Sequence, residues 1–242
     1  MASTTLPSRP LSWPAPAGPA AASLARRHAA WLLGGIVFSF LVPFLLADRL
    51  GMQKDVFYGI YALTVMALFA AWARDTGYSL RELCTRRWRL MLVLSVVFAA
   101  ASVLIVLAAE DQGPRSEGAG FVGALLWRGV LYGATDGLLL SAFPILVVFA
   151  AFAGSRLRRR RAGVVAVAAI AMAASLLMTA TYHLGYSDFR SGKVRKPMTG
   201  DLVWSVPTLV TLNPVGAPIA HAALHVTAVS YNEETDLFLP PH

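Results

Sequence analysis

The sequence predicts an all-α protein, a polytopic bundle of about six or seven transmembrane segments of which the last is broken. Of its 242 residues, 57% are hydrophobic and only 14% are charged, whereas charged residues make up about 25% of a typical soluble domain. The charges are also segregated, because mainly basic clusters separate long uncharged runs. Such a pattern is typical of a chain that crosses a bilayer repeatedly, so the lipid bilayer is its first expected partner.

The net charge of +8 would suggest nucleic acid as a partner in a soluble protein. Here the basic residues flank apolar runs, where they set membrane orientation and contact anionic lipid, so we expect no nucleic-acid partner. The single cysteine, Cys84, excludes an intramolecular disulfide and any cysteine-based zinc framework. Stability must therefore come from helix packing.

The chain divides into three parts. Residues 1–25 carry five prolines among alanine and serine, a composition that predicts a disordered cytoplasmic tail. Residues 26–231 form the expected helical membrane domain. Residues 232–242 form an acidic C-terminal tail, which we expect to lie in water.

The first three predicted spans are 29–47, 56–73 and 90–109, each close to the ~20 residues that cross a bilayer. Arginines precede the first span and fill the link between the second and third, whereas loop 110–118 is mainly acidic. The positive-inside rule then predicts a cell-membrane protein with a cytoplasmic N-terminus. Within the basic link, residues 79–89 begin with Ser79 and predict a short interfacial helix.

The apolar run from 118 to 155 is too long for one straight span. We expect a partly inserted helix around 120–135, a full span around 137–154, and a further span over 162–182. The polar loop that follows would lie outside by simple alternation, against its four basic residues, so the topology after residue 155 stays open. The last apolar run, 202–229, contains three prolines and predicts a broken or re-entrant helix. Such breaks need a protein or aqueous environment and often mark functional sites.

Three histidines lie in or beside apolar segments. His221 and His225 are four residues apart, so a helix would stack both imidazoles on one face as two ligands of one metal ion. His183, at the end of another predicted span, could supply the third ligand. This set predicts a zinc site of His183, His221 and His225 with an open position for water. The alternative is that these histidines form hydrogen bonds between helices and serve packing only.

Arg128 and Asp136 are the only charges between residues 118 and 155. Arg128 could orient a substrate carbonyl or carboxylate; the interpretation we favour is an ion pair with Asp136 that locks the bundle. No glutamate lies within any apolar run, and metal-assisted hydrolysis needs a positioned general base.

Trp127-Arg128-Gly129, the end-of-span His183, and His221 in the final segment together resemble the CAAX protease and bacteriocin-processing (CPBP) family of intramembrane metalloproteases. The family pattern is a Glu-Glu pair with an arginine four residues later, then Phe-x-x-x-His, then His-x-x-x-Asn or Asp. The resemblance implies catalytic roles for Arg128, His183 and His221. The sequence departs from the pattern at four positions, namely Gly123, Ala124, Thr179 and His225.

A CPBP-like protein without the glutamate pair lacks what that family uses to activate water. We therefore expect a degenerate member that binds a peptide or membrane-protein partner without glutamate-dependent peptidase chemistry. One alternative is an enzyme, a metal-dependent intramembrane protease whose site is remodelled with His225 and Asp136. The other is a transporter or haem-binding protein, because broken helices and transmembrane histidines also suit ion paths and axial ligation.

Overall fold

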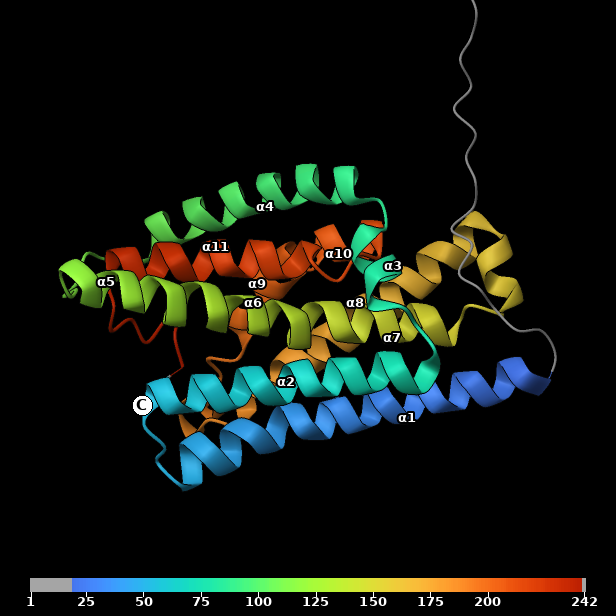
Figure 1. Ribbon diagram of the computed structural model, residues 1–242, viewed down its shortest axis with the longest axis horizontal. Helices are drawn as coiled ribbons and strands as arrows, with labels where there is room; N and C mark the ends of the chain where they lie inside the picture. Colours follow the sequence, from blue (N-terminus) through green and yellow to red (C-terminus); the bar gives the residue numbers. More distant parts are fainter. Residues whose placement is uncertain (1–18, 241–242) are drawn as a thin grey trace, which may run out of the picture.

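The computed structural model describes residues 19–240, and every regular element in that part is a helix. Figure 1 shows long helices lying side by side in a bundle. The elements are α1 (Pro19–Val42), η1 (Pro43–Arg49), α2 (Lys54–Thr76), α3 (Leu80–Thr85), α4 (Trp88–Ala109), α5 (Gly118–Ala124), η2 (Leu125–Tyr132), α6 (Gly133–Asp136), η3 (Gly137–Ala142), α7 (Phe143–Ala151), η4 (Arg156–Arg159), α8 (Arg161–Leu184), η5 (Ser187–Ser191), α9 (Arg195–Trp204), α10 (Val206–Thr211) and α11 (Gly216–Tyr231).

Five helices in the described residues are long and apolar enough to cross a membrane: Ala22–Arg49, Lys54–Thr76, Trp88–Ala109, Gly118–Ala151 and Arg161–Leu184. Their outer faces are apolar as well. On α4, for example, Val93 and Val96 are 61% and 66% exposed. Long helices with exposed apolar side chains are suited to contact with lipid hydrocarbon rather than water. The predicted all-α membrane bundle is therefore confirmed as the fold class.

The connections gather at two ends of the bundle. At one, which we call the acidic end, Asp48 accepts a hydrogen bond from the Ser187 backbone nitrogen at 2.9 Å and pairs with Arg190 at 3.2 Å. The α1–α2 and α8–α9 connections therefore lie together. Loop 110–117 lies at this end too, because its Ser116 contacts Glu233 and Arg128 connects Glu233 to Asp55 at the start of α2. The basic loop after α8 thus lies at the acidic end, as alternation requires.

The other end, the basic end, carries the arginine run 156–161 and the link that contains α3. There, the Asn213 side chain donates hydrogen bonds to the Cys84 and Arg86 carbonyls at 2.7 and 2.8 Å. The predicted break in the last apolar run is confirmed, because α9 and α10 run from the acidic end to this turn and α11 returns. Besides the five long helices, the described chain therefore runs along the bundle twice more, once as α9 with α10 and once as α11. Ser79 caps α3 as predicted, accepting from the Glu82 nitrogen.

The prediction of two elements between residues 118 and 155 is wrong. Residues Gly118–Ala151 form one helix, and 83% of its most apolar stretch is buried inside the bundle. A central helix covered by others does not have to match the bilayer thickness. Pro144 does not interrupt it, because a wider π-helical turn, η3, precedes the proline and accommodates its missing N–H.

The structure describes parts of the two predicted tails. Residues 1–18 of the predicted N-terminal tail lie outside the described part, but α1 begins at Pro19, a residue tolerated in the first turn of a helix. Residues 232–240 of the predicted C-terminal tail pack onto the acidic end. Its Thr235 and Leu239 are each only 2% exposed, and the Thr235 hydroxyl donates to Glu110 at 2.7 Å.

A stripe of glycines at four-residue spacing brings the central helix against α11. A Cβ atom added to any of the three glycines would lie 2.6–3.0 Å from the backbone of α11, so only glycine permits this approach. The facing pairs are Gly129 with Val226, Gly133 with Ala222, and Gly137 with Pro218. These contacts fix the height of α11 along the central helix.

Candidate metal centre

A cavity of about 580 Å³ lies between α4, the central helix, α8, α9 and α11, and the C-terminal segment covers part of it. Most of its wall is apolar or aromatic, from side chains such as Leu140, Trp204 and Leu224. Its polar lining side chains include Tyr132, Asp136, His183, Asp201, His221 and His225. An apolar cavity with a few convergent polar groups is the usual form of a ligand site.

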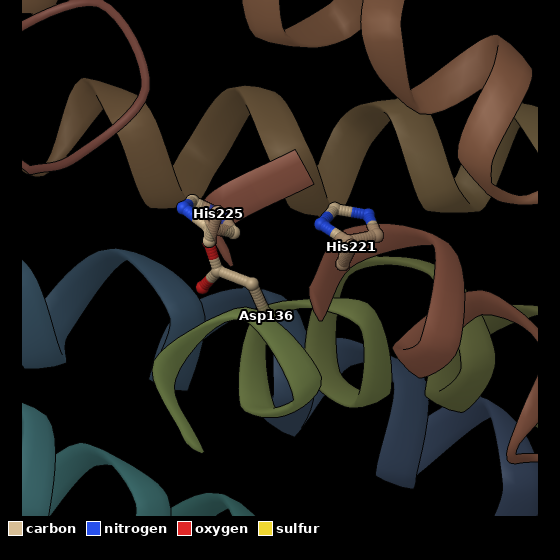
Figure 2. Close-up of side chains that lie close together, drawn as sticks. All are labelled: Asp136, His221 and His225. Atoms are coloured by element: carbon tan, nitrogen blue, oxygen red, sulfur yellow. The ribbon is translucent and has the colours of Figure 1, made fainter. Parts of the chain in front are cut away.

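Within this wall, Asp136, His221 and His225 each offer one ligand atom, and the three atoms lie within 4.8 Å of one another. All three residues are buried, at 3–4% exposure. Figure 2 shows the Asp136 carboxylate beneath His225, with one ring nitrogen of His221 facing this pair and the other pointing away. The predicted sharing of one helix face by His221 and His225 is confirmed, with ring centroids 6.4 Å apart.

The glycine stripe explains why these side chains meet. Gly133 lies one turn before Asp136, and its close neighbours are the His221 carbonyl and the His225 ring. The helix α11 begins immediately after the turn at Asn213, where the Thr208 hydroxyl accepts a hydrogen bond from the Ala217 nitrogen at 2.9 Å. The break in the last segment and the glycine stripe together place both histidines opposite Asp136.

Two imidazole nitrogens of the three candidate ligands form no hydrogen bond with the described residues. Asp136 Oδ1 accepts from the Tyr61 hydroxyl at 2.8 Å, and Asp136 Oδ2 lies 3.6 Å from His225 Nε2. His221 Nε2 lies 3.3 Å from Ser141 Oγ. The Nδ1 atoms of His221 and His225 are buried and have no hydrogen-bond partner among the described residues. Buried polar atoms normally have a partner, and a metal ion would supply one.

The predicted third ligand, His183, lies in the same cavity but outside this group. Its Nδ1 is 2.8 Å from the Thr179 carbonyl oxygen, and its ring packs edge-on against Tyr182 and Phe189. The third residue of the group that could hold a metal ion is Asp136. Two imidazoles and one carboxylate form a donor set that suits zinc or another first-row transition metal, and the set leaves coordination positions open.

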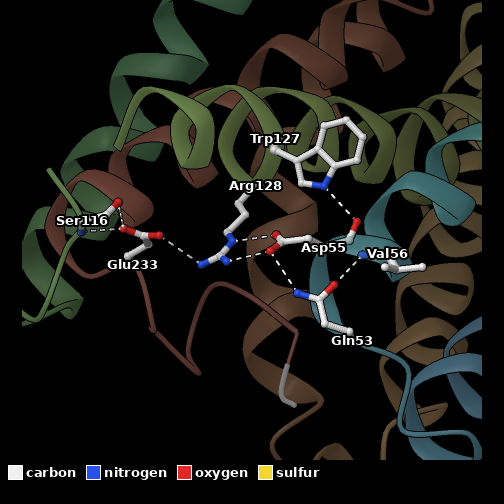
Figure 3. A network of polar contacts seen from close by, with 7 residues as sticks. All are labelled: Gln53, Asp55, Val56, Ser116, Trp127, Arg128 and Glu233. Atoms are coloured by element: carbon white, nitrogen blue, oxygen red, sulfur yellow. Dashed lines mark hydrogen bonds and ion pairs between the residues drawn. The ribbon is translucent and has the colours of Figure 1, made fainter. Parts of the chain in front are cut away.

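The predicted ion pair between Arg128 and Asp136 is wrong. The Arg128 guanidinium binds both carboxylate oxygens of Asp55, at 2.9 and 3.0 Å, and Glu233 at 3.2 Å. Figure 3 shows this network, in which Ser116 also holds Glu233. These partners are far from Arg128 in the sequence, at the start of α2 and in the C-terminal segment, so no local pattern predicted them. Arg128 is not among the residues that line the cavity.

Asp201 is a buried carboxylate that the sequence analysis missed. It accepts hydrogen bonds from Ser141 and Ser205 at Oδ1, at 2.7 and 2.8 Å, and from Ser175 at Oδ2, at 2.7 Å. The available signal was an aspartate one residue before the last apolar run, together with serines inside three apolar segments. These serines come from the central helix, α8 and the α9–α10 break, so no local pattern links them.

No family model, curated protein or solved structure matches this chain. Gly123 and Ala124, two positions at which the sequence departs from the CPBP pattern, do not line the cavity. Of Arg128, His183 and His221, the two histidines line the cavity and Arg128 does not.

Proposed function

We propose that this is a cell-membrane protein that binds a divalent transition metal, zinc in the first instance, at Asp136, His221 and His225. In this proposal the N-terminus is cytoplasmic, and the acidic end with its cavity faces outward. The metal and the cavity wall together bind an amphipathic ligand such as a segment of a peptide or membrane-protein partner. The observation that carries the proposal is the convergence of three buried ligand atoms beside two unpartnered imidazole nitrogens.

The chemistry of the cavity supports a ligand with an apolar body and an anionic group. Its volume is in the range of about 300–1,000 Å³ that small-molecule sites occupy. Arg195 and Lys196, at the start of α9, line it near the acidic end. Most basic residues of the chain gather at the basic end, so these two cations at the acidic end are exceptions. A role in ligand binding accounts for them.

The absence of a free carboxylate in the cavity favours binding over peptide hydrolysis. Its only acidic lining residues in the described chain are Asp136 and Asp201. Asp136 is one of the three proposed metal ligands, and the carboxylate of Asp201 accepts hydrogen bonds from three serine hydroxyls. A general base beside a metal-bound water would have to come from elsewhere. This supports a degenerate CPBP-like protein without glutamate-dependent peptidase chemistry.

A second candidate function is metal-dependent intramembrane proteolysis with a remodelled site. The observation in its favour is the open coordination left by three protein ligands, since a catalytic zinc keeps such a position for water. A panel of membrane peptides separates the two functions. Cleavage that disappears in His221→Ala establishes proteolysis, whereas binding of a peptide without cleavage establishes the binding function.

The first experiment is metal analysis by mass spectrometry on detergent-purified protein. We expect close to one zinc per chain in the wild type and loss of the metal in Asp136→Asn, His221→Ala and His225→Ala. The matched control is His183→Ala, which removes an imidazole from the same cavity but not from the ligand group, and which we expect to keep the metal. A metal-free wild type contradicts the proposal, and a haem absorption band in the purified protein would support axial ligation instead.

A further inference from the structure

The hydrogen bonds between Asp201 and His221 form a continuous chain through one hydroxyl group. Ser141 Oγ lies 2.7 Å from Asp201 Oδ1 and 3.3 Å from His221 Nε2. All three residues are buried, and each comes from a different element: α9, η3 and α11. Because Asp201 and Ser141 are fully buried, water does not compete for these contacts.

The chemistry of the groups sets the direction of this chain. In its ionised form a carboxylate only accepts hydrogen bonds; three hydroxyl contacts favour that form of Asp201, whereas its complete burial opposes it. Ser141 has a single hydroxyl proton, which it donates to the ionised form of Asp201. Its oxygen can then bond to His221 only as an acceptor, so Nε2 of His221 must carry the ring proton.

A neutral histidine protonated on Nε2 has its lone pair on Nδ1. That atom is the nitrogen of His221 left without a hydrogen-bond partner, and one ring nitrogen of His221 faces Asp136 and His225 in Figure 2. Metal-binding histidines typically donate their second ring N–H to a carboxylate or to a group that relays one, which fixes the tautomer and the ring orientation.

We propose that Asp201, acting through Ser141, is a positioning residue that holds His221 in the Nε2–H tautomer with the Nδ1 lone pair directed into the ligand group. Its effect on metal affinity rests on the proposed function. Its effect on the tautomer does not, because the hydrogen-bond chain exists with or without metal.

The tautomer is measured by ¹⁵N NMR of histidine-labelled full-length protein in detergent after removal of metal with a chelator. The His221 signals are assigned by their loss in His221→Ala. We expect the wild type to show a protonated Nε2 and an unprotonated Nδ1 at neutral pH. A wild type with the proton on Nδ1 overturns the inference directly and requires no variant to fold.

The variant series then tests the relay. Ser141→Ala removes the bond to His221, so we expect mixed tautomers and zinc affinity lower by about 10–100-fold, the usual range for such outer partners. Ser141→Thr keeps the hydroxyl and should restore both properties. The matched control is Ser205→Ala, which removes a hydroxyl bonded to the same oxygen of Asp201 but not to His221, and which we expect to leave the tautomer unchanged.

The outcomes separate this inference from the proposed function. An Nε2–H tautomer in a protein that binds no zinc would contradict the proposed metal function and leave the positioning role standing. Zinc binding that Ser141→Ala and Ser205→Ala weaken equally, with the tautomer unchanged in both, would overturn the positioning role and leave the metal site standing.

Discussion

Replacing Gly133 by alanine tests whether the close approach of the central helix to α11 builds the metal centre. The added Cβ would lie 2.8 Å from His225 Cδ2 and 2.9 Å from both the Ala222 Cα and the His221 carbonyl oxygen. Two of these three neighbours are backbone atoms, which cannot move aside by a change of rotamer. The two helices must therefore separate by a few tenths of an ångström.

The expected cost follows from two opposing effects. Overpacking of a well-packed interior typically costs about 1–3 kcal/mol, whereas alanine favours a helix over glycine by about 1 kcal/mol. Gly123→Ala is the matched control on the same helix, because a Cβ at that position has no neighbour within 4 Å. We therefore expect Gly133→Ala to be about 1–3 kcal/mol less stable than Gly123→Ala, and to lose metal as His225 is displaced.

The assay is reversible unfolding of both variants in the same detergent, followed by tryptophan fluorescence, with zinc content measured on each sample. Comparing the two variants cancels the gain in helix propensity that they share. If Gly133→Ala proves as stable as Gly123→Ala and keeps full zinc occupancy, the glycine contact does not position the site and the reasoning fails.

Three further predictions concern the two ends of the bundle. Burial disfavours the charge on Glu233, but hydrogen bonds from Ser116 and the charge of the Arg128 guanidinium lower its pKa overall. The stability that the ionised Glu233 adds is present above its ordinary pKa and is lost as the pH falls through the lowered pKa. Acid and Arg128→Gln should therefore both speed proteolysis of residues 232–240, and a proteolysis rate that neither changes argues against the network. Asn213→Ala removes two buried hydrogen bonds to backbone carbonyls and should cost about 1–3 kcal/mol in unfolding assays, and a neutral effect would show that the turn is held otherwise. Partial burial raises the pKa of the Cys84 thiol, so an impermeant maleimide should label this thiol slowly, and faster at higher pH. Labelling should occur only after cells are opened, and labelling of intact cells would place the basic end outside.

Local composition was sufficient for the membrane character, the first three spans, the capped helix at Ser79 and the break before α11. It was also sufficient to place His221 and His225 on one face, because a spacing of four residues has the same meaning in any helix. It failed over residues 118–151, where an apolar run of that length was divided in two. Bilayer thickness limits a helix that faces lipid, and this one is mostly covered by other helices.

The sequence by itself determined which segments enter the membrane and which residue types are available inside it, since hydropathy and spacing are local properties. Only the tertiary structure decided which of those residues meet. Arg128 pairs with Asp55 and Glu233, while Asp136 joins the histidines, because three glycines allow α11 to approach the central helix at one height. Partners more than 70 residues apart along the chain, such as Arg128 and Asp55, are brought together by helix packing, which no local pattern records.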